Sequence, residues 1–145
     1  MNSAAGTNGA GGAEGAPLIE LRDVVFSYAG HTVVDGVSLQ VDRCELVALL
    51  GPNGCGKTTI MRLINGLELA DAGAYLFDGH AVDAAYLKDS ATAQRFHQRV
   101  GFVFQNADAQ LFCATVGEEV AFGPAQMGLP ADELDRRVHD AIELF

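Results

Sequence analysis

Residues 51–59 read GPNGCGKTT, and this stretch decides the fold. It satisfies the pattern G-x-x-x-x-G-K-[ST] through Gly51, Gly56, Lys57 and Thr58. Glycines allow the backbone to curl so that consecutive amide groups point at phosphate oxygens, and a helix N-terminus adds positive potential at the same place. We therefore predict a phosphate-binding loop. Its predicted binding residues are Gly51, Pro52, Asn53, Gly54, Cys55, Gly56, Lys57, Thr58 and Thr59.

Two side chains of this loop have specific predicted roles. Lys57 is expected to reach the β- and γ-phosphates of a nucleotide as a point charge. The Thr58 hydroxyl is expected to ligate Mg²⁺. The alternative is a glycine-rich turn that happens to precede a lysine, but the four required residue types coincide by chance in a chain of this length with a probability on the order of 1 per cent.

The segments on either side of the loop predict a strand, a loop and a helix in that order. Residues 46–50 (LVALL) form a uniformly apolar run, which is typical of a strand buried on both faces of a parallel sheet. A helix is predicted over residues 57–65, with Gly66 as its C-terminal stop. Residues 100–104 are a second candidate for a buried strand. The apolar residues at helical spacing in the helix predicted after the loop are Ile60, Leu63, Ile64 and Leu67.

Two strand-like runs precede the loop. Residues 19–28 and 33–41 alternate apolar with polar side chains, with one irregularity at Val24, Val25 and Phe26, as strands of a sheet with one solvated face do. The turn at Ala29 and Gly30 predicts that they pair antiparallel. Residues 1–17 are rich in Gly and have neither a basic start nor an apolar block, so we expect a flexible tail and no secretory signal. The structured domain is expected over residues 18–145.

Turn signals predict the next elements. Residues 75–77 are expected to form a short strand that ends at the turn formed by Asp78 and Gly79. A helix is expected over residues 92–99, and a loop over residues 105–112.

Capping signals predict two further helices. Thr115 and Glu118 form a capping-box pattern at a helix start. We expect this helix to be short, because Gly123 and Pro124 interrupt it. Pro130 introduces an amphipathic helix without a stop signal at its end. Its apolar stripe consists of Leu134, Val138, Ala141, Ile142 and Phe145.

Composition excludes several classes of function. A formal net charge of −10 argues against a surface for nucleic acid or anionic membrane, because such surfaces need clustered Lys and Arg. No apolar stretch reaches the roughly 18 residues of a membrane span. The three Cys and four His lack the spacing of a zinc site or a disulfide framework. A reducing cytosol is the simplest compartment.

From Leu18 onward the chain resembles ATP-binding cassette (ABC) ATPases. The resemblance rests on the order of three features: an aromatic residue, then GPNGCGKTT, then the glutamine of VGFVFQ. The resemblance implies an α/β P-loop NTPase fold, with an N-terminal antiparallel β subdomain and part of a parallel-sheet core. It implies ATP and Mg²⁺ as cofactors and a Tyr28 ring that stacks on adenine, with Phe26 as the competing assignment. It also implies that Gln105 contacts Mg²⁺ near the attacking water, beside Lys57 as the second catalytic residue.

The stretch QNADAQLFCATVGEEVAFGPAQMGL more specifically resembles the ATPases of energy-coupling factor importers, which take up cobalt, nickel or vitamins. It departs from that group at Ala107 and Cys113. The resemblance implies a transmembrane coupling subunit facing Leu111 and Phe112, a second ATPase subunit, and a peripheral position on the cytoplasmic face of the membrane. The carrying residues are Gln105, Asn106, Asp108, Gln110, Leu111, Phe112, Thr115, Val116, Glu119, Val120, Phe122, Gly123 and Pro124.

The family also requires an S-G-G signature, an apolar strand ending in Asp-Glu and a later switch His, and residues 1–145 contain none of these. Asp78 precedes Gly79 in a turn, and His139 comes too early in the chain. We therefore expect an N-terminal portion that lacks the C-terminal half of the cassette, binds ATP, hydrolyses it poorly, and leaves residues 46–50 and 100–104 partly unpaired. The alternatives are a nucleotide-binding module or remnant without catalysis, and a different P-loop enzyme such as a kinase or GTPase.

Overall fold

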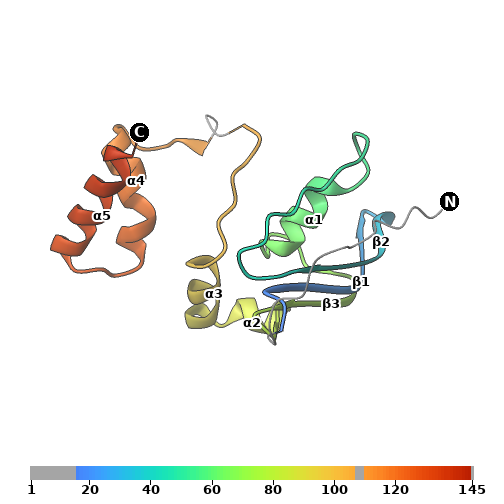
Figure 1. The fold of residues 1–145 in the computed structure, drawn as a ribbon. Helices are drawn as coiled ribbons and strands as arrows, with labels where there is room; N and C mark the ends of the chain where they lie inside the picture. Colours follow the sequence, from blue (N-terminus) through green and yellow to red (C-terminus); the bar gives the residue numbers. More distant parts are fainter. Residues whose placement is uncertain (1–15, 107–109, 145) are drawn as a thin grey trace. The chain divides into compact units, whose positions relative to one another are not determined.

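The computed structural model describes residues 16–106 and 110–144 (Figure 1). Most of the predicted N-terminal tail, together with Ala107, Asp108 and Phe145, lies outside the described residues. The chain divides into two compact units, Met1–Ala84 and Ala85–Phe145, which are described separately.

The first unit is built on a four-stranded antiparallel sheet in the order β2-β1-β3-β4. The prediction of an N-terminal antiparallel subdomain is thus confirmed. The turn between β3 and β4 has positive φ at both Asp78 (52°) and Gly79 (78°). Such two-residue turns match the right-handed twist of paired strands, which explains why Asp-Gly was a reliable signal. The strands are β1 (Ile19–Tyr28), β2 (His31–Val41), β3 (Ala72–Phe77) and β4 (His80–Ala81).

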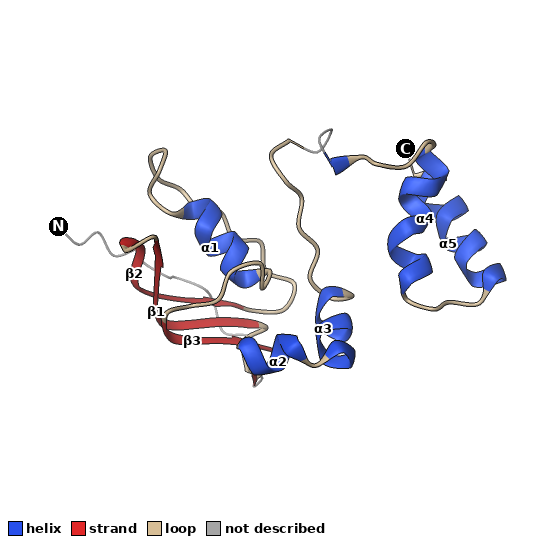
Figure 2. Cartoon of the chain, turned by 180° about the vertical axis from the view of Figure 1, so that it is seen from behind, coloured by secondary structure: helices blue, strands red, loops and turns tan. Residues whose placement is uncertain are grey.

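Helix α1 (Lys57–Ile64) lies along one face of this sheet (Figures 1 and 2). Leu63 of α1 is buried, and the Tyr75 hydroxyl of β3 donates a 2.7 Å hydrogen bond to the carbonyl of Ile64. Gly66 ends the helix as predicted: its φ is 72°, and its amide donates to the carbonyl of Leu63. The unit's buried hydrophobic residues are Leu21, Val24, Phe26, Val34, Leu63, Tyr75, Phe77 and Val82.

The prediction of buried strands at residues 46–50 and 100–104 is wrong. Neither segment forms a strand, and Leu46, Leu50 and Val103 are 98%, 91% and 90% exposed. A strand exists only when its amide and carbonyl groups pair with a neighbour, and none of the described strands lies beside these segments. This agrees with the expectation that an incomplete parallel sheet leaves them unpaired.

The regular elements of the second unit, among its described residues, are helices joined by loops. Helix α3 (Ser90–His97) begins two residues before the prediction, because the Asp89 side chain accepts a 2.9 Å hydrogen bond from the amide of Thr92 and so acts as the N-cap. Helix α2 (Ala84–Lys88) was not predicted; it has five residues, too few for a periodic pattern.

Helix α4 (Val116–Gln126) opens with the predicted capping box, in which Thr115 and Glu118 bond reciprocally. The prediction that Gly123 and Pro124 interrupt it is wrong. Pro124 removes one donor near the end of an 11-residue helix, which continues only to Gln126. Helix α5 (Ala131–Glu143) follows Pro130 as predicted and packs against α4. No helix among the described residues has both the length and the hydrophobicity that crossing a bilayer requires.

Candidate functional site

The loop between residues 51 and 56 leads directly into α1, and Gly56 is the N-cap of that helix. Gly54 and Gly56 have φ of 81° and 91°, in the left-handed region that favours glycine. No side chain caps the helix, and its first hydrogen bond in the described structure runs from the Ile60 amide to the Gly56 carbonyl, at 2.9 Å. The amides of the first turn, at residues 57–59, therefore face the positive end of the helix, where an anion can accept from them.

Close contacts hold the loop in this shape. A Cβ atom at Gly56 would lie 2.9 Å from the carbonyl oxygen of Val33 in β2, and one at Gly51 would lie 2.7 Å from the Cys55 sulfur. The loop therefore packs against β2 with no room for a side chain at residue 56. Space as well as the motif requires glycine at position 56, whereas the Cys55 side chain can turn away from a Cβ atom at position 51.

The Lys57 side chain turns back into the loop. Its Nζ donates hydrogen bonds to the carbonyls of Gly51 (2.8 Å) and Pro52 (2.7 Å) and lies 3.7 Å from the Cys55 sulfur. An ammonium group is thus fixed where the backbone curls. This arrangement can hold a polyanion by charge and by backbone amides together.

The two threonines of the loop differ in exposure. Thr58 is exposed, whereas Thr59 is buried at 8% exposure. Mg²⁺ in nucleotide sites keeps several waters and takes one or two protein ligands plus the phosphates. The Thr58 hydroxyl therefore fits the predicted metal ligand, and Thr59 fits a packing role.

The structure distinguishes the two aromatic candidates at the end of β1. Phe26 is buried at 6% exposure, whereas Tyr28 is 42% exposed. Their rings meet edge to face with centroids 4.7 Å apart. Phe26 is thus a core residue, and only Tyr28 of this pair has ring surface available for a ligand.

Gln105 lies in the second unit, exposed in a bend after residues 100–104. It begins the segment that leads to α4, and this segment was predicted to be a loop. Its predicted contact with Mg²⁺ stays a prediction.

Four exposed apolar side chains lie in α4 and in the segment just before it. Leu111, Phe112, Val116 and Phe122 are 63%, 64%, 72% and 47% exposed, and the rings of Phe112 and Phe122 meet edge to face at 4.7 Å. We call these four residues the Leu111 surface. Two of its residues, Leu111 and Val116, also line a pocket of about 390 Å³. The pocket is lined by Leu111, Cys113, Ala114, Thr115, Val116, Glu119 and Val120.

Glu119 fixes the backbone of this segment. Its carboxylate accepts hydrogen bonds from the amides of Cys113 (2.9 Å) and Phe112 (3.2 Å). The Cys113 amide, above all, holds the pKa of Glu119 below its ordinary value. Burial and the neighbouring Glu119 raise the pKa of the Cys113 thiol. The backbone of Phe112 and Cys113 is thus fastened to the first turns of α4.

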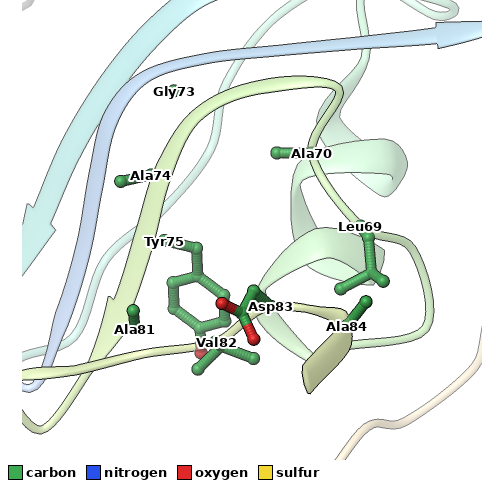
Figure 3. Close-up of a pocket in the computed structure, with 9 residues that line it drawn as sticks. All are labelled: Leu69, Ala70, Gly73, Ala74, Tyr75, Ala81, Val82, Asp83 and Ala84. Carbon is green, nitrogen blue, oxygen red and sulfur yellow. The ribbon is translucent and has the colours of Figure 1, made fainter. Parts of the chain in front are cut away.

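A second pocket, of about 470 Å³, lies in the first unit between β3, β4 and the loop after α1 (Figure 3). Its walls are mostly small or aliphatic, and the hydroxyl of its Tyr75 already donates to the carbonyl of Ile64. It includes none of the loop residues 51–59, so it is separate from the phosphate-binding loop. Its lining residues are Leu69, Ala70, Gly73, Ala74, Tyr75, Ala81, Val82, Asp83 and Ala84.

A comparison with protein families decides the identity of the fold. The family model described as ABC transporter matches residues 34–145. The chain belongs to the ABC transporter family. The solved structure of cbiO1 from Clostridium perfringens, part of the ABC transporter complex cbiONQ, superposes with a TM-score of 0.74 at 32% identity and covers 88% of this chain and 50% of that chain. The predicted fold class is thereby confirmed.

Individual members of the ABC transporter family are similar over most of the chain. A putative ABC transporter ATP-binding protein of Clostridium acetobutylicum is 45% identical over 88% of this chain and 53% of its own length. The nickel import ATP-binding protein LarO of Lactiplantibacillus plantarum is 42% identical over 88% and 53%. The energy-coupling factor transporter ATP-binding protein EcfA of Methanothermobacter thermautotrophicus is 46% identical over 87% and 40%. The chain spans about half the length of these curated relatives.

One residue beside the candidate site carried no signal in the sequence. Glu68, in the loop after α1, accepts hydrogen bonds from the Tyr28 hydroxyl and from the Arg62 guanidinium. Nearby, Asp71 accepts from the amide of Ser27. A single acidic residue in a loop has no periodic or motif signal, so only the fold shows its contacts with Tyr28 and Arg62.

Proposed function

We propose that this chain binds ATP with Mg²⁺ through residues 51–59. The observation that carries the proposal is the placement of the Lys57 ammonium 2.7–2.8 Å from two loop carbonyls, at a helix N-terminus that no side chain caps. On binding, the loop amides hold phosphate oxygens, and Lys57 neutralises the β- and γ-phosphates. Thr58 is assigned to Mg²⁺, which when bound neutralises phosphate charge.

Tyr28 is assigned to the adenine base. Its exposed ring offers a flat apolar face, and base–aromatic stacking is worth about 1–3 kcal/mol. Stacking does not read hydrogen-bonding edges, so this contact by itself gives affinity for a base without strict selectivity. Gln105 is assigned to the metal and the attacking water on the strength of the family resemblance alone.

We further propose that the protein powers an importer of the energy-coupling factor type, with nickel, cobalt or a vitamin as cargo. Relatives carry the names nickel import ATP-binding protein and energy-coupling factor transporter ATP-binding protein. The Leu111 surface supports contact with a helix of a transmembrane coupling subunit, because two aromatic and two aliphatic side chains are exposed together. A second ATPase subunit and a peripheral position at the cytoplasmic membrane face belong to the same proposal.

ATP hydrolysis is assigned to a cassette of the length found in the relatives. Phosphoryl transfer needs charges and donors positioned around the γ-phosphate and the attacking water. Within residues 1–145 we assign only Lys57 and Gln105 to these tasks. The rival proposal is a nucleotide-binding module without catalysis. Both proposals expect ATP binding, and only the rival expects no ATP hydrolysis by a cassette of the relatives' length.

Equilibrium binding of three ligands tests the proposal: ATP, GTP and inorganic triphosphate, each with Mg²⁺. All three share the polyphosphate that the loop holds, and only the nucleotides can stack on Tyr28. We expect ATP to bind about 5- to 150-fold more tightly than triphosphate, from the stacking contribution. A strong preference for GTP would favour a different P-loop enzyme, and binding of none of the three would refute the nucleotide site.

A further inference from the structure

The carboxylate of Glu68 joins two parts of the proposed nucleotide site. Its Oε1 accepts a hydrogen bond from the Tyr28 hydroxyl at 3.1 Å and from Nε and Nη2 of Arg62 at 3.2 and 3.0 Å. Tyr28 is the last residue of β1, and Arg62 lies in α1, the helix that begins at Lys57. One acidic side chain therefore connects the base-stacking candidate to the helix of the phosphate-binding loop.

The surrounding backbone holds this carboxylate in place. The Asp71 carboxylate accepts a 2.7 Å hydrogen bond from the amide of Ser27, and the Asp71 amide donates to the Val25 carbonyl at 2.9 Å. The loop that carries Glu68 is thus fastened to the end of β1. The Glu68 side chain is only 23% exposed, so its charge is partly shielded from water and paired with Arg62.

We propose that Glu68 is a positioning residue that sets the orientation of the Tyr28 ring for base stacking. The inference rests on the proposed role of Tyr28. The ring is restrained at one edge by its contact with Phe26 and at its hydroxyl end by Glu68. A tyrosine side chain has two rotatable angles, so these two restraints together fix the plane of the ring. Arg62 in turn fixes Glu68 through two donors.

The test compares dissociation constants for ATP and inorganic triphosphate, both with Mg²⁺, in the full 145-residue chain and its variants. We expect Glu68→Leu to weaken ATP binding about 3- to 10-fold, a part of the whole stacking contribution, and to leave triphosphate binding unchanged. Glu68→Gln keeps an acceptor oxygen for the hydroxyl, so we expect it to restore most of the ATP affinity.

Tyr28→Phe provides a matched control, because it removes the hydroxyl and keeps the ring. We expect it to match Glu68→Leu, and the double variant to be no weaker than either single variant, since both remove the same interaction. If Glu68→Leu does not fold, as judged by far-UV circular dichroism, Tyr28→Phe decides the question alone. ATP binding by Tyr28→Phe at native affinity would overturn the inference.

Two further outcomes separate this inference from the proposed function. Equal weakening of ATP and triphosphate in Glu68→Leu would show a general structural role and overturn positioning. Tyr28→Ala removes the ring itself, and we expect ATP binding to weaken about 5- to 150-fold. Native ATP affinity in Tyr28→Ala would refute base stacking, whereas a loss there without a loss in Glu68→Leu would refute the role of Glu68 alone.

Discussion

Replacing Gly56 by Ala adds one methyl group at the N-cap of α1, and we expect it to destabilise the first unit. The φ of Gly56 is 91°, and an L residue in the left-handed region costs about 1–2 kcal/mol. The added Cβ would lie 2.9 Å from the carbonyl oxygen of Val33, so the backbone of β2 or of the loop must move. Overpacking of this kind costs about 1–3 kcal/mol more.

Gly54→Ala is the matched control. Gly54 has a similar φ of 81°, but nothing lies within 4 Å of an added Cβ. It should therefore lose only the backbone contribution, about 1–2 kcal/mol, whereas Gly56→Ala should lose about 2–5 kcal/mol. The free energy of unfolding of each variant is measured by urea titration followed by far-UV circular dichroism.

The difference between the two variants isolates the contact with Val33. Equal losses in Gly54→Ala and Gly56→Ala would refute the close packing of the loop against β2. Native stability in both variants would refute the left-handed backbone of the loop itself.

Two further predictions concern Cys55 and Glu119. Alkylation of the exposed Cys55 with a bulky maleimide should block ATP binding, because the adduct fills the phosphate-binding loop; Cys55→Ser treated with the same reagent should bind ATP normally, and binding by the labelled native chain would contradict the loop geometry. The pKa of Glu119 lies below its unfolded value near 4.5, chiefly because the Cys113 amide donates to the carboxylate, so its stabilising contribution is complete above pH 4.5 and is lost as pH falls through the folded pKa. The stability difference between the native chain and Glu119→Gln, measured by urea titration, should therefore shrink as the pH falls below about 4.5, and a difference that stays constant there would contradict this assignment.

Local signals made the phosphate-binding loop and its helix predictable. The glycine pattern sets the loop conformation within a few residues, and Gly66 ends α1 through bonds to the preceding turn. The capping box at Thr115 is equally local. Such elements depend on neighbours in sequence, which are all visible in the sequence itself.

The features that the sequence did not predict depend on contacts with residues distant in sequence. Residues 46–50 have the composition of a buried strand, but a strand forms only beside another strand, and the described residues supply none there. Phe26 and Tyr28 share one face of β1 by their spacing, so alternation could not rank them; only the difference in burial did. Glu68 went unnoticed because its partner Tyr28 is 40 residues away.

The most direct test of the nucleotide site at residues 51–59 is a measurement of ATP affinity with and without Mg²⁺. The measurement compares the native chain with Lys57→Ala. Removal of the ammonium group takes away a charge-assisted phosphate contact of about 1.5–3 kcal/mol, so we expect Mg²⁺-dependent ATP binding that is roughly 10- to 150-fold weaker in the variant. Equal affinity of the two proteins, or a native chain without Mg²⁺-dependent ATP binding, would contradict the assignment of residues 51–59 as a nucleotide site.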